Sequence, residues 1–358
     1  MFGFKQLSAI LLRPVEVKES AEQSPLEAAG VPVSLADCRN CPNPCEEDHE
    51  EYPKRIEAMI DTTSEMLGSV KPYRRQVVIS TGKSDWERSV TDVEDTLAAY
   101  LVALQTRLGG THTPPSAFTP AGPSPVVGIF KDNETHKVSV LNGSHDTISD
   151  DCASETVLVF PDYKLVADVR RTLEGARDLW ENAVHPAVPR LGALDPTSAL
   201  RTWIIPYACV ILICSHRRRD VRCAVVAPKL EAAFGKVLER EGWDVHTQIE
   251  EPDGPPLEAF NECDRDREVQ MLRRLQELDR QDPKRALVLK TSHIGGHKYA
   301  GNVIIYLPSG AGVWYGRVST HEVEPIVRTT IIGGRILPPL LRGGVNLARP
   351  DCKRLNDW

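Results

Sequence analysis

The sequence has no apolar run of the roughly eighteen residues that a membrane-spanning helix needs, so we expect no membrane segment. It also has no excess of positive charge: 43 Lys and Arg against 50 Asp and Glu give a net charge of −7 and a pI near 5.9. That balance argues against a general nucleic-acid binder. A content of 41% hydrophobic and 26% charged residues is typical of a globular protein with real cores.

The sequence also lacks a secretory signal, and its nine cysteines are an odd number, which fits poorly with a disulfide framework. A reducing compartment, with cysteines used for metal or redox chemistry, is the better interpretation. The first fifteen residues contain Lys5 and Arg13 but no acid, which weakly resembles a mitochondrial presequence. The final Asp357-Trp358 instead resembles the tail by which the iron–sulfur assembly machinery recognises cytosolic clients. We therefore expect a mitochondrial or cytoplasmic protein.

At 358 residues the chain is long enough for two domains. Residues rich in Pro, Gly, Ser and Thr at 109–125 predict a flexible insertion within the first of them. The predicted parts are a flexible N-terminal tail (1–30), an N-terminal α/β domain with a Cys-rich start (31–183), a linker (184–198), a second domain (199–340) and a C-terminal tail (341–358).

The second domain has the element order strand, helix, strand, helix, strand, hairpin, helix. Its predicted strands are 209–214, 244–248, 286–290, 303–307 and 312–318, and its predicted helices are 228–241, 264–280 and one from 325. This order predicts a thioredoxin-like, ferredoxin-type domain with a mixed sheet and helices on both faces. In the first domain we expect strands at 76–80, 126–130, 137–141 and 156–160, and helices at 93–104 and 165–183.

Two cysteines and two histidines follow predicted strands of the second domain. Cys214 and Cys223 are separated by eight residues, and His293 and His297 by three. Thiolates and imidazoles are ligands of zinc and of iron–sulfur clusters. The close histidine pair is typical of zinc sites, whereas the long gap between the cysteines favours a wider object such as a two-iron cluster. The spacing alone leaves both open.

Two features of the surrounding loops refine this picture. Gly295 and Gly296 between the histidines let the backbone approach a cluster closely and offer it unhindered N–H groups. Cys214-Ser-His216 matches half of a Rieske motif, but no histidine closely follows Cys223. We therefore exclude a Rieske centre and interpret His216 as an exposed loop residue.

A basic stretch lies between the two cysteines and contains Arg217, Arg218, Arg219 and Arg222. One interpretation is a docking patch for an acidic protein redox partner, or a local field that stabilises a reduced cluster. The other is an ordinary solvated loop between a strand and a helix.

A second group of soft ligands lies near the N-terminus: Cys38, Cys41, Cys45 and His49 fall within twelve positions. This group can bind zinc, or Cys38 and Cys41 can act as a dithiol pair. Ordinary thiols in a proline-stiffened loop are the third interpretation. The rival functions for the whole chain are therefore a thiol–disulfide redox protein and a zinc-stabilised interaction module.

The motifs around the first group resemble a known family. The family's thioredoxin-like ferredoxin domain has motifs similar to Arg219-Asp220-x-Arg222-Cys223-x-x-x-Ala227-Pro228, His293-x-Gly-Gly-His297-Lys-Tyr-Ala-Gly-Asn302 and Trp314-Tyr-Gly316. This family is the sucrase/ferredoxin-like family, and the resemblance covers roughly residues 34 to 340. Within it, the chain is most similar to a group named for altered inheritance of mitochondria, which favours a mitochondrial location.

The resemblance implies a [2Fe–2S] cluster with Cys214 and Cys223 on one iron and His293 and His297 on the other. Neutral imidazoles leave such a cluster less negative than four thiolates do, so its potential should exceed that of an all-cysteine ferredoxin. Because an imidazole ligand can lose its ring proton, we also expect the potential to depend on pH. The implied role is an electron carrier or redox sensor rather than an enzyme with its own substrate.

Overall fold

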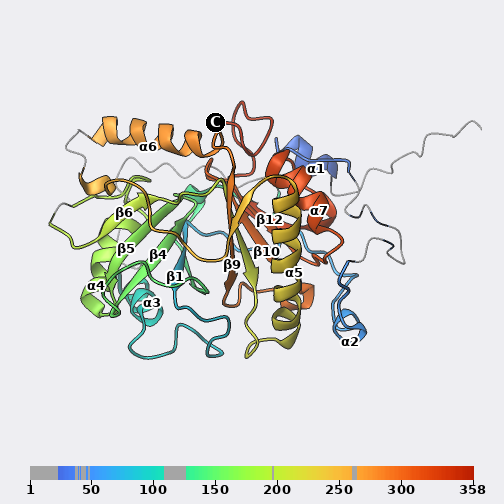
Figure 1. The fold of residues 1–358 in the computed structure, drawn as a ribbon, viewed down its shortest axis with the longest axis horizontal. Coiled ribbons are helices and arrows are strands. Elements are labelled where there is room, and N and C mark those ends of the chain that lie inside the picture. The colour runs from blue at the N-terminus through green and yellow to red at the C-terminus, as the bar shows by residue number, and fades with distance from the viewer. Residues whose placement is uncertain are drawn as a thin grey trace, which may run out of the picture.

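The computed structural model describes residues 23–36, 39, 41, 46, 49–108, 126–195, 197–259 and 264–358. In that part of the chain, strands from both halves join in one mixed sheet (Figure 1). The strands are β1 (Arg75–Ser80), β2 (Ile129–Phe130), β3 (Val138–Gly143), β4 (Ser154–Phe160), β5 (Lys164–Arg170), β6 (Arg201–Ile204), β7 (Cys209–Cys214), β8 (Asp244–His246), β9 (Arg285–Thr291), β10 (Val303–Tyr306), β11 (Gly312–Tyr315) and β12 (Leu341–Val345).

The sheet has the strand order β2-β12-β11-β10-β7-β9-β3-β1-β4-β5-β6, with β8 paired to β9. In the C-terminal half, β7 and β9 are parallel, while β10 is antiparallel to β7 and β11 is antiparallel to β10. The two halves meet where β3 pairs with β9 through Gly143 and Thr291. The chain is therefore a mixed α/β protein whose halves share one sheet.

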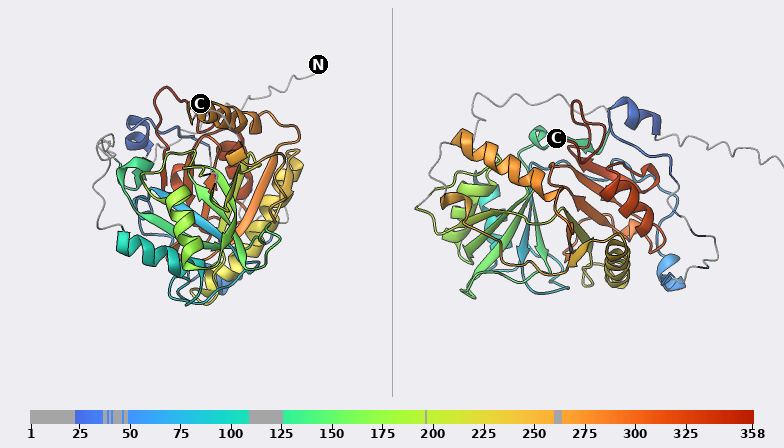
Figure 2. Two further views of the ribbon diagram at one scale, coloured as in Figure 1. Left: turned by 90° about the vertical axis from the view of Figure 1, so that its left-hand side faces the viewer. Right: turned by 45° about the horizontal axis from the view of Figure 1, so that its top comes forward.

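The central strands are apolar on both faces because both faces are covered. In β7, Ile211 and Ile213 pack into one core cluster, while Val210 and Leu212 pack into another. This is the pattern of a strand buried between helical layers. Figures 1 and 2 show these layers around the sheet. The covering helices are α5 (Val221–Arg240) and α7 (Val323–Pro325) on one core, α6 (Asp264–Leu278) on the other, and α3 (Leu97–Leu108) and α4 (Leu173–Leu179) on the N-terminal half.

Most predicted elements are present, but the first half of the predicted helix at 165–183 is wrong, whereas residues 173–183 are helical. Residues Lys164–Arg170 form β5, and the helix α4 begins only after Thr172. Val166 and Leu165 pack into different clusters, so the apolar residues follow the two-residue period of a strand. In this region the apolar residues fit both a helical period and a strand period. Because both faces are buried, the strand is the more stable structure.

The helix α5 begins seven residues earlier than predicted. Asp220 caps it by accepting a hydrogen bond from the Arg222 N–H at 2.9 Å, and Pro228 lies inside the helix instead of at its start. Burial of Val226 and Ala227 in the core, together with the N-cap, stabilises these added turns and offsets the internal proline, which costs about 3 kcal/mol. As a consequence, Cys223 lies in the first turn of α5.

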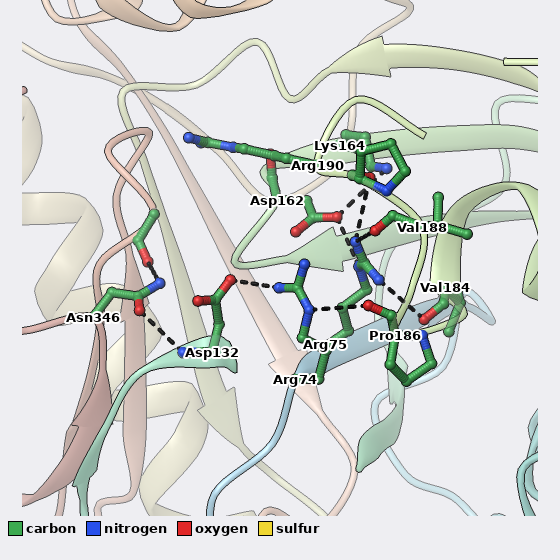
Figure 3. Close-up of polar contacts among 12 residues, drawn as sticks. Arg74, Arg75, Asp132, Asp162, Lys164, Val184, Pro186, Val188, Arg190 and Asn346 are labelled. Carbon is green, nitrogen blue, oxygen red and sulfur yellow. Dashed lines mark hydrogen bonds and ion pairs between the residues drawn. The ribbon is translucent and has the colours of Figure 1, made fainter. Parts of the chain in front are cut away.

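The predicted linker at 184–198 wraps around a buried cation (Figure 3). The fully buried Arg75 guanidinium donates to the carbonyls of His185 and Val188, each at 2.7 Å, and pairs with the Asp162 carboxylate at 2.7 Å. Beyond this segment, β6 returns to pair with β5 of the N-terminal half. The segment therefore connects two strands of one lobe of the sheet.

Both predicted tails are partly wrong. Residues 341–345 form the buried strand β12 between β11 and β2, because the run Leu-Arg-Gly-Gly-Val fits closely against both neighbours. Near the N-terminus, α1 (Gln23–Ala28) places Leu26 fully inside the core. The predicted insertion at 109–125 lies outside the described residues. Among the described helices, none is both long and apolar enough to cross a membrane.

Candidate metal centre

The cysteine side of the centre is built by the strand β7 and the helix α5. Cys214 is the last residue of β7, and Cys223 lies in the first turn of α5. Their exposed fractions are 2% and 1%. The Sγ atoms of the two residues lie within 4.8 Å of each other. A strand end and a helix start, both fixed by the core, therefore hold these two sulfur atoms together.

The histidine side is built by the loop after β9. Thr291 at the end of β9 pairs with Cys214 at the end of the parallel strand β7, so the two loops leave the same edge of the sheet. His293 is half-buried and His297 is exposed. Their ring centroids are 5.4 Å apart. Neighbouring parallel strands thus bring residues some eighty positions apart to one place.

The possible ligand atoms of Cys214, Cys223 and His293 lie close together. The Cys214 Sγ lies 3.8 Å from the His293 Nδ1. One ligand atom each from Cys214, Cys223 and His293 lie within 4.8 Å of one another, and His297 is in ring contact with His293. Two thiols and two imidazoles therefore gather at one sheet edge, and the group is suited to bind a metal ion or cluster.

The two glycines in this loop adopt left-handed backbone conformations. Gly295 and Gly296 have φ angles of +82° and +67°, a region that L side chains rarely adopt. A Cβ atom on Gly296 would lie 2.3 Å from the Arg342 Nη2, whereas one on Gly295 would meet nothing within 4 Å. Gly296 is therefore required for packing as well as for its backbone angles.

The proton balance of the site favours a thiolate at Cys214. A hydrogen bond from Cys223, opposed by burial and supported by His293, lowers the pKa of Cys214 well below its usual range. The same shared hydrogen bond, together with burial, raises the pKa of Cys223. Burial lowers the pKa of His297, although the Asp220 carboxylate opposes this. A thiolate and a neutral imidazole are the forms that bind metals.

His216 was predicted as an exposed loop residue, and this was wrong. Its side chain is 1% exposed and lies beneath the histidine loop. The His293 backbone N–H donates to the His216 Nδ1 at 3.2 Å, so the Nε2 carries the proton and donates to the Trp86 carbonyl at 2.8 Å. His216 therefore positions His293. Its place two residues after Cys214 is the sequence signal that could have revealed it.

A second supporting residue, Arg342, was missed because it lies in the predicted tail. Its guanidinium donates to the Gly295 carbonyl at 3.1 Å and to the Asn302 Oδ1 at 2.7 Å. The Asn302 Nδ2 in turn donates to the Gly296 carbonyl at 3.0 Å. Burial lowers the pKa of Arg342 to about 10, while charge on Cys214 opposes that shift. Arg342 therefore places a buried positive charge behind the histidine loop.

The predicted docking patch is partly covered by its own chain. Arg218 is hydrogen-bonded to Glu87, and Arg219 donates to the Arg88 carbonyl at 3.3 Å. Arg222 donates to the Asp220 carboxylate and to the Met59 carbonyl. Arg217 is exposed. The role of these arginines in docking stays a prediction.

The N-terminal ligand group is described in part. Cys41 and His49 lie together with His321, which the sequence had not singled out. Cys38 and Cys45 lie outside the described residues, so the predicted dithiol pair of Cys38 and Cys41 stays a prediction.

Comparisons with known proteins identify related chains. A family model described as sucrase/ferredoxin-like matches residues 66–343. Altered inheritance of mitochondria protein 32 of Clavispora lusitaniae is 35% identical over 134 residues, covering 37% of this chain and 34% of that protein. The protein of the same name from Debaryomyces hansenii is 31% identical over 213 residues, covering 54% and 61%.

A further relative is actin patches distal protein 1 of Saccharomyces cerevisiae, which is 28% identical over 123 residues, covering 34% of this chain and 29% of that protein. The chain thus spans between about a third and three fifths of the lengths of the first two relatives. No solved structure matches.

Proposed function

Because this chain belongs to the sucrase/ferredoxin-like family, we propose that Cys214, Cys223, His293 and His297 hold a [2Fe–2S] cluster. The observation that carries this proposal is the convergence of two thiols and an imidazole within 4.8 Å, with the second imidazole beside them. The donor set fits the group, because thiolates and imidazoles both ligate two-iron clusters. The open space beside Gly295 leaves room on the histidine side.

The geometry supports a division of the ligands between the two irons. The two sulfur atoms lie within 4.8 Å of each other, so they are placed to bind one iron together, and the adjacent histidine rings are placed to bind the other. When bound, such a cluster supplies one-electron acceptance and donation. The chain holds the ligands, seals the cysteine side from water and supplies a buried positive charge from Arg342.

We also propose that the C-terminal half is a thioredoxin-like domain. Its support is the strand order β11-β10-β7-β9, in which β7 and β9 are parallel and the hairpin of β10 and β11 is antiparallel to β7. α5 and α6 pack on the two opposite cores. In this arrangement the cluster loops lie at the carboxyl ends of the two parallel strands.

The proposed role is electron transfer or redox sensing with a protein partner, after cluster insertion by the iron–sulfur assembly machinery. The exposed positive charge of Arg217, in the loop that follows Cys214, favours an acidic partner. The names of the first relatives refer to mitochondria, and on that ground we propose a mitochondrial location.

The test is the visible absorption spectrum of the full chain, purified without oxygen from iron-supplemented cells, before and after dithionite. We expect about two irons per chain and charge-transfer bands that bleach on reduction. Cys214→Ala should abolish both. The matched control is Cys209→Ala, which removes an equally buried thiol from the other end of β7 and should leave them intact. A colourless, iron-free parent protein would contradict the proposal.

A further inference from the structure

A second group of soft ligands lies apart from the metal centre and joins the N-terminal segment to the turn before α7. The Cys41 Sγ lies 2.9 Å from the His321 Nδ1, and the rings of His49 and His321 meet edge to face with centroids 5.0 Å apart. One ligand atom from each of the three residues lies within 4.8 Å of the other two. Cys41 and His321 are each 8% exposed.

We propose that Cys41, His49 and His321 bind a structural zinc ion. One thiol and two imidazoles are donors that zinc prefers, whereas calcium and magnesium require oxygen ligands. Zinc bonds of roughly 2.3 Å to sulfur and 2.0–2.1 Å to nitrogen place tetrahedral donors about 3.3–3.6 Å apart. The spacing within this group requires shifts of at most about an ångström to reach that geometry, well within side-chain rotation. This proposal does not depend on the proposed cluster.

The geometry favours a metal over thiol catalysis at this place. A cysteine paired with one histidine is also the arrangement of an activated nucleophile. Here, however, the thiol is 8% exposed, which leaves little room for a substrate, and a second imidazole converges on the same point. A nucleophile does not need that second imidazole. The adjacent Glu322 carboxylate accepts hydrogen bonds from Ser319 and Arg39, and it is not among the grouped ligand residues.

The surrounding contacts show what the ion would hold. The Thr320 Oγ1 donates to the Glu50 carbonyl at 2.9 Å, and the Tyr52 hydroxyl donates to the Val318 carbonyl at 2.8 Å. These bonds fix the backbone just after His49 and just before His321, so they hold the two ligand positions close to each other. The two histidines are some 270 positions apart in the sequence. A metal ion bound to both would therefore cross-link distant segments, as structural metal sites do.

Residues 49–66 form a segment, here called the strap, that runs from His49 to the metal centre. The Asp61 N–H donates to the Lys298 carbonyl at 2.8 Å, and the Tyr299 hydroxyl donates to the Glu65 carbonyl at 2.6 Å. On the cysteine side, Arg222 donates to the Met59 carbonyl at 2.7 Å. The zinc ion would therefore anchor one end of a segment that covers both ligand loops.

The first test is the zinc content of the full chain by elemental analysis, after expression with added zinc and dialysis against a weak chelator. We expect about one zinc per chain, as for a structural site. Cys41→Ala and His321→Asn should each lose it. The matched controls Cys152→Ala and His136→Asn change exposed residues and should keep it. A parent protein without zinc, or a Cys41→Ala/His321→Asn double variant that keeps it, overturns the proposal.

A second test identifies the zinc ligands in the parent protein, so this result does not depend on the folding of a variant. Metal contents of two variants then separate this site from the metal centre. Zinc-edge X-ray absorption of the parent protein should show at least one sulfur at about 2.3 Å and nitrogens at about 2.0–2.1 Å. Six oxygen or nitrogen ligands without sulfur would overturn the proposal. In Cys214→Ala the iron should be lost and the zinc kept. Zinc that is lost from Cys214→Ala but kept in Cys41→Ala lies at the other site, which also overturns it.

Discussion

The cysteine side and the histidine side of the metal centre are built in opposite ways. Cys214 and Cys223 are almost fully buried, and a central strand and a twenty-residue helix hold them. His297 is exposed and follows two glycines with positive φ. Core packing fixes the first side, whereas the second depends on individual hydrogen bonds that His216 accepts and that Asn302 and Arg342 donate. We infer that the cysteines hold the proposed cluster in the core, and that protons and partner proteins reach it on the histidine side.

The largest expected effect on cluster binding comes from a substitution that disturbs the packing of the histidine loop. Gly296→Ala places a methyl group 2.3 Å from the Arg342 Nη2 and should abolish most cluster binding. Gly295→Ala carries the same backbone strain of about 1 kcal/mol but meets no neighbour, so most of the cluster should remain. Iron content and visible absorbance measure both. Equal losses in the two variants would show that backbone strain, not the contact with Arg342, decides.

The next effect concerns a histidine that is not a ligand. Burial lowers the pKa of His145 to about 4, below the ordinary value of 6.5. As the pH falls from 6.5 to about 4, His145 takes up a proton in the unfolded chain but stays neutral in the folded chain. The free energy of unfolding therefore decreases toward pH 4. The loss is about 1.4 kcal/mol for each pH unit.

Urea unfolding at pH 7 and pH 5 measures this effect. His145→Gln should remove about 2 kcal/mol of the difference between the two pH values, and the exposed His136→Asn should not change it. The pH dependence of the reduction potential should be the same in His145→Gln and the parent. If His145→Gln abolished it, the buried histidine and not the exposed ligands would control the proton coupling.

A smaller effect is expected from the charge behind the histidine loop. Positive charge favours the more negative reduced form, so Arg342→Met should lower the reduction potential. We expect roughly 60 mV, which is a tenfold change in the equilibrium constant of a one-electron couple. Arg342→Lys keeps a charge but not the guanidinium fork and should recover part of the shift. Redox titration of cluster-loaded protein measures both, and a potential that rises in Arg342→Met would contradict this role.

The smallest effect is expected at the exposed end of the basic stretch. Arg217→Glu should slow reduction by the anion dithionite about two-fold at low salt, because it reverses a charge near the histidine side. High salt should remove the difference. Arg201→Glu changes an exposed arginine on β6 and serves as the control. Stopped-flow absorbance measures the rates, and a slower reaction that persists at high salt would indicate a structural change rather than electrostatic steering.

Local sequence patterns predicted the local parts of this structure. The apolar runs predicted β1, β7 and β9 nearly to the residue. The ligand spacing and a family resemblance singled out the four residues of the candidate metal centre, whose role as ligands stays a prediction. What the sequence did not reveal was contact between distant segments. His321 meets Cys41 across 280 positions, and Arg342 reaches Gly295 from a strand that the pattern assigned to a tail. A strand of five residues with two glycines carries too weak a signal to be recognised alone.

We infer that the two sides of the centre bind two different irons of the proposed cluster. Mössbauer spectroscopy of the full chain enriched in ⁵⁷Fe, in the oxidised state, tests this most directly. We predict two iron sites in equal amounts with different quadrupole splittings, one ligated by Cys214 and Cys223 and the other by His293 and His297. A single class of iron site, or iron that persists unchanged after both histidines are replaced by alanine, would contradict the account.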